Sequence, residues 1–147
     1  MKKCKKIMSM LTSLLIAAAL VFGVSGQMVK AAEETESSIG YMDRETRGAC
    51  LQSGYSQISK VGSGKIAVGG TTTAQRVVST VSINVNVERK VNGDWEHYTS
   101  WTSTKNNAVA VTFSKTITVP KGYYYRVRSV HYANSDVSSS ATNGLYV

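Results

Sequence analysis

The sequence has one proline among its 147 residues, and no segment after Cys50 places apolar residues at helical spacing. The missing helical period argues against a helical domain. The chain instead has short runs of β-branched and aromatic residues, bounded by glycine, asparagine and serine. This pattern is typical of an all-β protein.

Acidic residues are scarce where the domain would fold. After Glu45 the acidic residues are Glu88, Asp94, Glu96 and Asp136, and the first three crowd one predicted hairpin. A glycoside hydrolase needs two carboxyl groups that face each other across the sugar. Glu88 and Glu96 fit solvated cross-strand pairing better, since Arg89 and Lys90 stand between them. We therefore do not expect an enzyme, and a hydrolase is our third hypothesis.

Ligands for metals and cofactors are also few. The two histidines, His97 and His131, are not spaced to share a metal with a cysteine or an acid. The run Gly62 to Lys65 lacks the earlier glycine and the following serine or threonine of a phosphate-binding loop. We expect no metal, no cofactor and no catalytic residue.

The first 31 residues have the pattern of a secretory signal peptide. Four lysines within residues 1–6 precede an apolar run at residues 7–24, and Val29 and Ala31 place small residues at a cleavage site. The alternative is an uncleaved membrane anchor, because the run is nearly long enough to span a bilayer. We expect cleavage after Ala31, a secreted protein, and contact with the membrane only in transit.

Removal of that segment changes the charge. It takes away the lysines at positions 2, 3, 5, 6 and 30, so the formal net charge falls from +8 to +3. The basic isoelectric point is thus largely a property of the signal, and nucleic-acid binding loses most of its support. One cysteine, Cys50, remains. It is a half-buried small residue, a free thiol or an intermolecular bridge.

The remaining chain divides into a flexible acidic tether, residues 32–48, and a single β-sandwich domain, residues 49–147. We predict an antiparallel sandwich of immunoglobulin or fibronectin type, or a small barrel, because turn signals recur at intervals of about ten residues. The seven predicted strands cover residues 50–59, 65–73, 78–91, 95–103, 108–119, 123–132 and 140–147. Lys105-Asn106-Asn107 is predicted to turn the fourth strand into the fifth.

The third and fourth strands form a predicted hairpin around Asn92-Gly93, the strongest short hairpin signal. A two-residue loop would pair Lys90 with Trp95 and leave the indole on the polar face. A three-residue loop would pair Val85 with Trp101 and turn both indoles inward. We favour the second register, because large aromatic side chains dominate core burial.

The most informative predicted surface is aromatic and basic. The side chains that we assign to it are Tyr124, Arg126, Arg128, Lys90 and His97. Aromatic rings stack on sugars, and guanidinium groups hold carboxylates or phosphates. The alternative is that Arg126 and Arg128 are ordinary solvated charges.

Several stretches resemble a family of small secreted proteins of unknown function from Gram-positive bacteria. They include Lys60 to Ala74, Val85 to Trp95 and, most specifically, Gly122-Tyr123-Tyr124-Tyr125-Arg126-Val127-Arg128 with His131. The resemblance begins near Gln57 and implies a signal peptide and a compact β domain. It implies no catalytic residues.

From the sequence we expect a secreted, non-catalytic binding or adhesion module. Its expected partner is an extracellular glycan, a cell-wall polymer or a surface protein, with cell-wall polymer or glycan favoured. The alternative is a structural subunit of an extracellular assembly, joined through an edge strand or through Cys50.

Overall fold

A computed structural model describes residues 35–43 and 48–147, all of which belong to one compact unit, Glu34–Val147. These residues form seven antiparallel strands and no helix, which confirms the predicted all-β class. The strands are β1 (Ser37–Tyr41), β2 (Leu51–Gly62), β3 (Lys65–Val91), β4 (Asp94–Thr118), β5 (Tyr124–Ala133), β6 (Asp136–Ala141) and β7 (Leu145–Tyr146). The predicted signal peptide, residues 1–31, lies outside the described residues.

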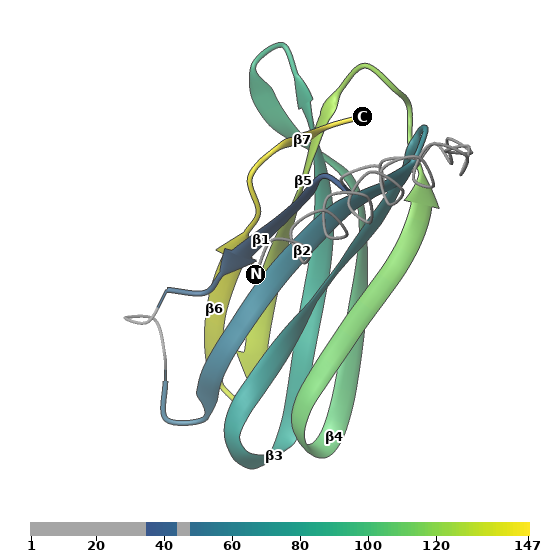
Figure 1. The fold of residues 1–147 in the computed structure, drawn as a ribbon. Helices are drawn as coiled ribbons and strands as arrows, with labels where there is room; N and C mark the ends of the chain where they lie inside the picture. The colour runs from purple at the N-terminus through teal and green to yellow at the C-terminus, as the bar shows by residue number, and fades with distance from the viewer. Residues whose placement is uncertain (1–34, 44–47) are drawn as a thin grey trace, which may run out of the picture. The chain divides into compact units, whose positions relative to one another are not determined.

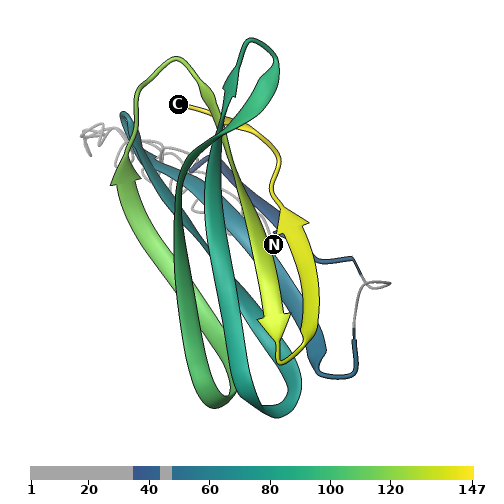
Figure 2. The same cartoon turned by 180° about the vertical axis from the view of Figure 1, so that it is seen from behind.

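The strands belong to one sheet in which β3 changes one of its neighbours along its length, while β4 stays paired with β3 (Figure 1). The order is β1-β2-β3-β5-β6, with β4 paired to β3 and β7 paired to β5. Residues 65–73 of β3 lie between β2 and β4, whereas residues 81–89 lie between β5 and β4. Both long strands bend sharply where the pairing shifts between Thr73 and Val78, as Figure 2 also shows.

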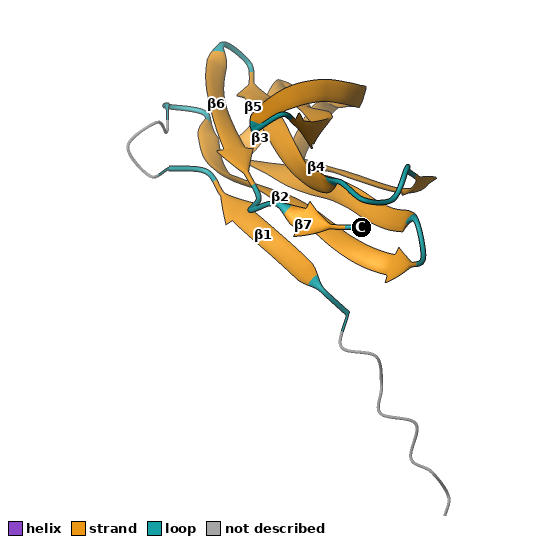
Figure 3. Ribbon diagram, turned by 90° about the horizontal axis from the view of Figure 1, so that it is seen from above, coloured by secondary structure: helices purple, strands orange, loops and turns teal. Residues whose placement is uncertain are grey.

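This bend folds the sheet back on itself almost into a barrel. We call β1, β2, residues 65–73 of β3 and 110–118 of β4 the first half-sheet. The second half-sheet comprises residues 78–91 of β3, 94–108 of β4, β5, β6 and β7. In the view from above, β1 and β2 lie across the core from β5 and β6 (Figure 3).

Two details of the predicted strand division are wrong. The predicted turn Lys105-Asn106-Asn107 lies within β4, where Asn106 still pairs with Thr80 and Asn107 takes a positive φ of 49°. The predicted strands 95–103 and 108–119 are therefore one strand, β4. The predicted strands 65–73 and 78–91 are likewise one strand, β3. Because β3 and β4 run through both half-sheets as one hairpin, the arrangement differs from separate immunoglobulin-type sheets.

Part of the predicted flexible tether also has regular structure. Ser37–Tyr41 forms β1 and pairs with β2, with Ser37 opposite Ser59 and Tyr41 opposite Tyr55. A Cβ atom at Gly40 would lie 1.7 Å from the carbonyl oxygen of Ala141. Only glycine therefore lets β1 pack so closely against the end of β6.

Both predicted hairpin registers occur, separated by a β-bulge. Asn92 (φ 51°) and Gly93 (φ 93°) form a two-residue turn, so Lys90 pairs with Trp95. Between Glu88–His97 and Val87–Thr99 the register then shifts by one residue, Tyr98. Beyond the bulge Val85 pairs with Trp101, as the favoured register requires. The prediction that both indoles turn inward is therefore right for Trp101 and wrong for Trp95.

The core lies between the two half-sheets and follows the period of two in β3. It is filled mainly by fully buried aliphatic side chains, among them Leu51, Ile58, Ile66, Val68, Val81, Ile83, Val85 and Val87. Within it lies one polar network centred on His131, which is fully buried. Its Nδ1 lies 2.8 Å from Thr72 Oγ1 and its Nε2 lies 2.8 Å from Ser140 Oγ. Burial lowers the pKa of His131 to about 4.

In the part of the chain that the structure describes, no helix could cross a membrane.

Candidate binding site

All five predicted ligand residues lie on the outward face of the second half-sheet. Lys90 comes from β3 and His97 from β4, while Tyr124, Arg126 and Arg128 alternate along β5. The pairing of β3 with its two neighbours brings them together, because Glu88 faces both His97 and Arg126. The structure thus gathers the predicted residues, but it does not leave all of them available to a ligand.

Arg126 is already paired within the sheet. Its Nε donates a hydrogen bond to Glu88 Oε2 at 2.6 Å, and both side chains are largely buried, with 25% and 11% exposure. Its guanidinium carbon also lies 4.5 Å from the ring centre of Trp95. Arg126 therefore serves chiefly to hold β3, β4 and β5 together on this face.

Trp95 is the centre of this surface. Besides Arg126, the ammonium of Lys90 lies 5.7 Å from its ring centre. The tip of the indole lies over Gly144, where a Cβ atom would come within 2.9 Å of Trp95 Cη2 and 3.6 Å of Tyr124 Cδ1. Trp95 therefore links the hairpin tip to the segment that enters β7.

His97 is also engaged. Its Nδ1 lies 2.5 Å from Asn86 Oδ1, which can only accept, so that His97 nitrogen is the donor. Asn86 Nδ2 in turn donates to Glu88 Oε1 at 3.4 Å. A chain of polar contacts thus runs from His97 on β4 through Asn86 and Glu88 on β3 to Arg126 on β5.

Tyr124, Arg128 and Lys90 remain accessible. Arg128 is exposed, and its side chain makes no hydrogen bond or ion pair with any residue that the structure describes. Tyr124 is 49% exposed and packs against Tyr146, which is 51% exposed. The ring centres of the two tyrosines lie 5.1 Å apart and their planes are inclined by 58°.

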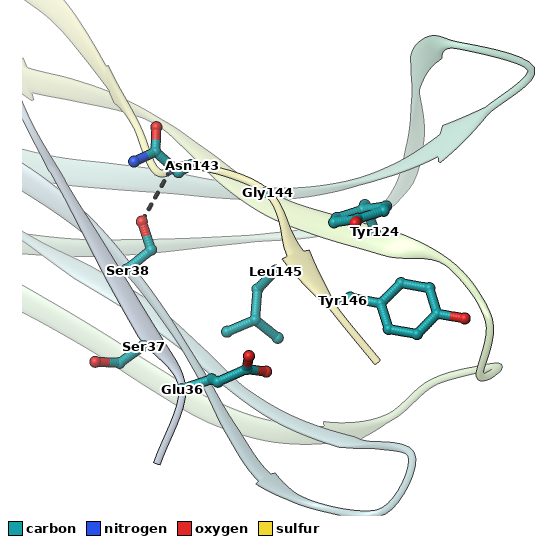
Figure 4. Close-up of a pocket in the computed structure, with 8 residues that line it drawn as sticks. All are labelled: Glu36, Ser37, Ser38, Tyr124, Asn143, Gly144, Leu145 and Tyr146. Carbon is teal, nitrogen blue, oxygen red and sulfur yellow. Dashed lines mark hydrogen bonds between the residues drawn. The ribbon is translucent and has the colours of Figure 1, made fainter. Parts of the chain in front are cut away.

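The two tyrosines border a pocket of about 370 Å³, which we call the tyrosine pocket (Figure 4). It forms because β6 ends at Ala141 and only the short β7 follows on β5, which leaves a notch beside β1. Its lining residues are Glu36, Ser37, Ser38, Tyr124, Asn143, Gly144, Leu145 and Tyr146. A hydrogen bond from Asn143 N to Ser38 Oγ, 3.0 Å long, ties the two sides of the notch together.

Sequence reasoning missed most of this pocket. We assigned Glu36 to the tether and Tyr146 to the last predicted strand, residues 140–147, without singling either out. The break Asn143-Gly144 before Leu145 was the one available signal, since it separates β6 from β7. The pocket joins residues from the two ends of the described chain, and no sequence pattern indicates that proximity.

The chemistry of the site favours binding. Aromatic rings, hydroxyl groups, an amide and one carboxylate line one hollow, and side chains of these kinds are typical of small-ligand sites. Among the described residues, no three histidine, cysteine, aspartate or glutamate side chains are grouped to hold a metal ion.

The chain belongs to DUF6147, a family of unknown function, whose model matches residues 17–145. No curated protein matches the sequence.

Proposed function

We propose that this DUF6147 protein is a secreted, non-catalytic binding module of Gram-positive bacteria. Its tyrosine pocket would hold a short segment of an extracellular glycan or cell-wall polymer. A volume of 370 Å³ lies near the lower end of the range of ligand pockets, roughly 300–1,000 Å³. That size suits a few sugar units better than a folded protein partner.

The observation that carries the proposal is the pair of inclined, half-exposed rings of Tyr124 and Tyr146 at the pocket rim. Sugar rings present C–H faces that pack on aromatic side chains, and hydroxyl groups that need hydrogen-bond partners. Glu36, Ser38 and Asn143 line the same hollow and carry hydrogen-bond donors and acceptors. The pocket therefore offers contacts both for the C–H groups of a sugar and for its hydroxyl groups.

Accessible positive charge extends the proposal to an anionic polymer. Arg128 and Lys90 are exposed on the half-sheet that carries Tyr124. A guanidinium group holds a phosphate or carboxylate through two parallel hydrogen bonds, and an ammonium group acts as a point charge. Such contacts weaken as salt screens them.

Co-sedimentation of residues 34–147, a compact unit by themselves, with intact cell-wall sacculi across a salt series tests this function. We expect pelleting that falls with salt, falls further for Arg128→Ala, and is lost for Tyr124→Ala with Tyr146→Ala. Tyr132→Ala, on the same strand but outside the pocket, is the matched control. Absence of pelleting at low salt, or equal loss with the control, would contradict the proposal.

A second candidate function is a structural subunit, favoured by the unpaired edge of β4. This strand runs for 25 residues, and among the strands that the structure describes it pairs only with β3. Lys105 and Lys115 lie opposite the buried Val81 and Val68, so both point toward the inner side of that edge. Inward charges discourage edge-to-edge pairing, which makes this the weaker candidate.

A further inference from the structure

The outward face of the first half-sheet presents a regular array of uncharged side chains. One row crosses all four strands in register: Tyr41 pairs with Tyr55, Tyr55 with Thr71, and Thr71 with Thr112. Thr71 Oγ1 lies 3.2 Å from the Tyr55 hydroxyl and 2.8 Å from Thr112 Oγ1, so hydroxyl groups are linked across three strands.

The next two rows continue without charge. Their members, in strand order, are Ile39, Gln57, Gly69 and Ser114, followed by Ser37, Ser59, Ala67 and Thr116. Small residues in the middle keep the surface level. At Gly69 an added Cβ atom would lie 2.3 Å from the carbonyl oxygen of Phe113, so a larger residue does not fit the sheet there. We call these three rows the threonine face.

The absence of charge on the threonine face is unusual for an exposed surface. Lysine, arginine, glutamate and aspartate usually make up about 25–35% of a soluble surface. The neighbouring charged side chains in β3 and β4 lie elsewhere: Lys65 is at the end of the array, and Lys115 points inward. A face that keeps its hydroxyl groups and excludes charge suits a partner that is itself polar and uncharged.

We infer that the threonine face binds the flat surface of an uncharged polysaccharide. Its serine, threonine, tyrosine and glutamine side chains both donate and accept hydrogen bonds, as sugar hydroxyl groups require. Tyr41, 74% exposed and with its ring centre 6.2 Å from that of Tyr55, supplies an aromatic surface. Ile39 beside it, 52% exposed, adds apolar contact.

A second copy of the chain fits this face less well. Strands about 4.8 Å apart and a two-residue repeat of about 6.7 Å give three rows an extent of roughly 20 Å by 20 Å, or ~400 Å². A stable interface needs about 800 Å² from each partner and an apolar centre. Here the exposed large apolar side chains, Ile39 and Tyr41, stand on the edge strand β1.

This surface is distinct from the site proposed above. The residues that test it, Thr112 on β4 and Tyr41 on β1, do not line the tyrosine pocket. The tyrosine pocket contacts the array only through Ser37. Either surface can therefore be impaired while the other is kept.

The test is sedimentation of residues 34–147 with microcrystalline cellulose and with insoluble chitin. We expect the protein in the pellet of at least one polymer, largely independent of salt. Thr112→Lys should weaken binding at least about tenfold, because a lysine on the face loses hydration against a neutral surface. Tyr41→Ala should weaken it as well without adding charge.

Thr104→Lys is the matched control, since Thr104 is an exposed threonine of the same strand on the second half-sheet. Thermal unfolding of each variant checks that the fold is intact. Loss of binding in Thr112→Lys with retention in Thr104→Lys, and in Tyr124→Ala with Tyr146→Ala, supports the inference and separates it from the pocket.

Three outcomes would overturn it: no sedimentation with either polymer, equal effects of Thr112→Lys and Thr104→Lys, or a dimer in light scattering that Thr112→Lys dissociates. The last result would identify the threonine face as an interface between copies.

Discussion

The imidazole of His131 and the hydroxyl of Thr72 join the two half-sheets through a 2.8 Å hydrogen bond inside the core. Thr72 Oγ1 also donates to the carbonyl oxygen of Ser82 at 3.1 Å, so toward His131 it can only accept. The Nδ1–H of His131 therefore donates to Thr72. Because burial favours the neutral ring, its Nε2 carries no proton and accepts from Ser140. The network requires one protonation state of one histidine.

This requirement predicts that stability falls in mild acid. The pKa of His131 is about 4 in the folded protein, below its ordinary value of 6.5, because burial disfavours the charged ring. The native state is thus at full stability above pH 6.5 and loses up to about 3 kcal/mol as the pH falls to 4. Urea unfolding at pH 7, 5.5 and 4 measures this loss.

A matched variant assigns the effect. His97→Ala removes the other histidine, which lies on the surface, so a loss of stability in acid that persists in this variant belongs to His131. The backbone N–H groups of Cys50 and Leu51 lower the pKa of Asp136, so most of its contribution is lost below the pH range of this test. A free energy of unfolding that stays constant between pH 7 and 4 would contradict the prediction.

Arg126 and Arg128 should respond differently to truncation, although they alternate on one strand. Arg126→Ala leaves Glu88 largely buried without its partner and takes the cation from Trp95, so we expect a loss of about 1–2 kcal/mol. Arg128→Ala removes an exposed side chain and should change stability by less than about 0.5 kcal/mol. Chemical denaturation compares them, and equal losses would show that Arg128 has a structural role too.

The sequence predicted the faces of strands well, because burial follows the period of two. The alternating residues Val81, Ile83, Val85 and Val87 are all fully buried. It did not predict the bulge at Tyr98, since one extra residue leaves both flanking patterns intact. That single residue decides that Trp95 faces outward while Trp101 packs against the core.

The features of the site that were not predicted depend on contacts between residues far apart in the sequence. Arg126 is occupied by Glu88 on β3, and the pairing of β3 with β5 that brings them together was not predicted from the sequence. β1 lacks a buried apolar row, and its position depends on backbone pairing with β2 and on the close approach of Gly40 to Ala141. Neither feature produces a periodic pattern.

The lysines at the open edge of β4 should keep the protein from associating. Lys115 Nζ lies 4.8 Å from the ring centre of Trp101. The ring of Trp101 in turn stacks on that of Phe113, with 5.7 Å between the ring centres. Lys115→Thr with Lys105→Thr removes both inward charges, so we expect dimers or larger species at high concentration. Light scattering measures the mass, with Lys121→Thr, in the turn before β5, as control. A monomer at every concentration would show that the bends and the bulge of β4 are sufficient protection.

Gly144 should control the position of Trp95 and, through it, the tyrosine pocket. A Cβ atom there would lie 2.9 Å from the tip of the indole, which is the free end of a side chain and can move. Gly144→Ala should therefore lower the free energy of unfolding by less than about 1 kcal/mol but displace Trp95 toward solvent.

The displacement is measured by fluorescence in a Trp101→Phe background, where Trp95 is the remaining tryptophan. We expect a red shift of the emission, easier quenching and weaker pelleting with sacculi. Gly62→Ala, which would meet only the Lys65 side chain at 3.8 Å, is the control. Unchanged emission in Gly144→Ala would mean that Trp95 does not rest on Gly144 in solution.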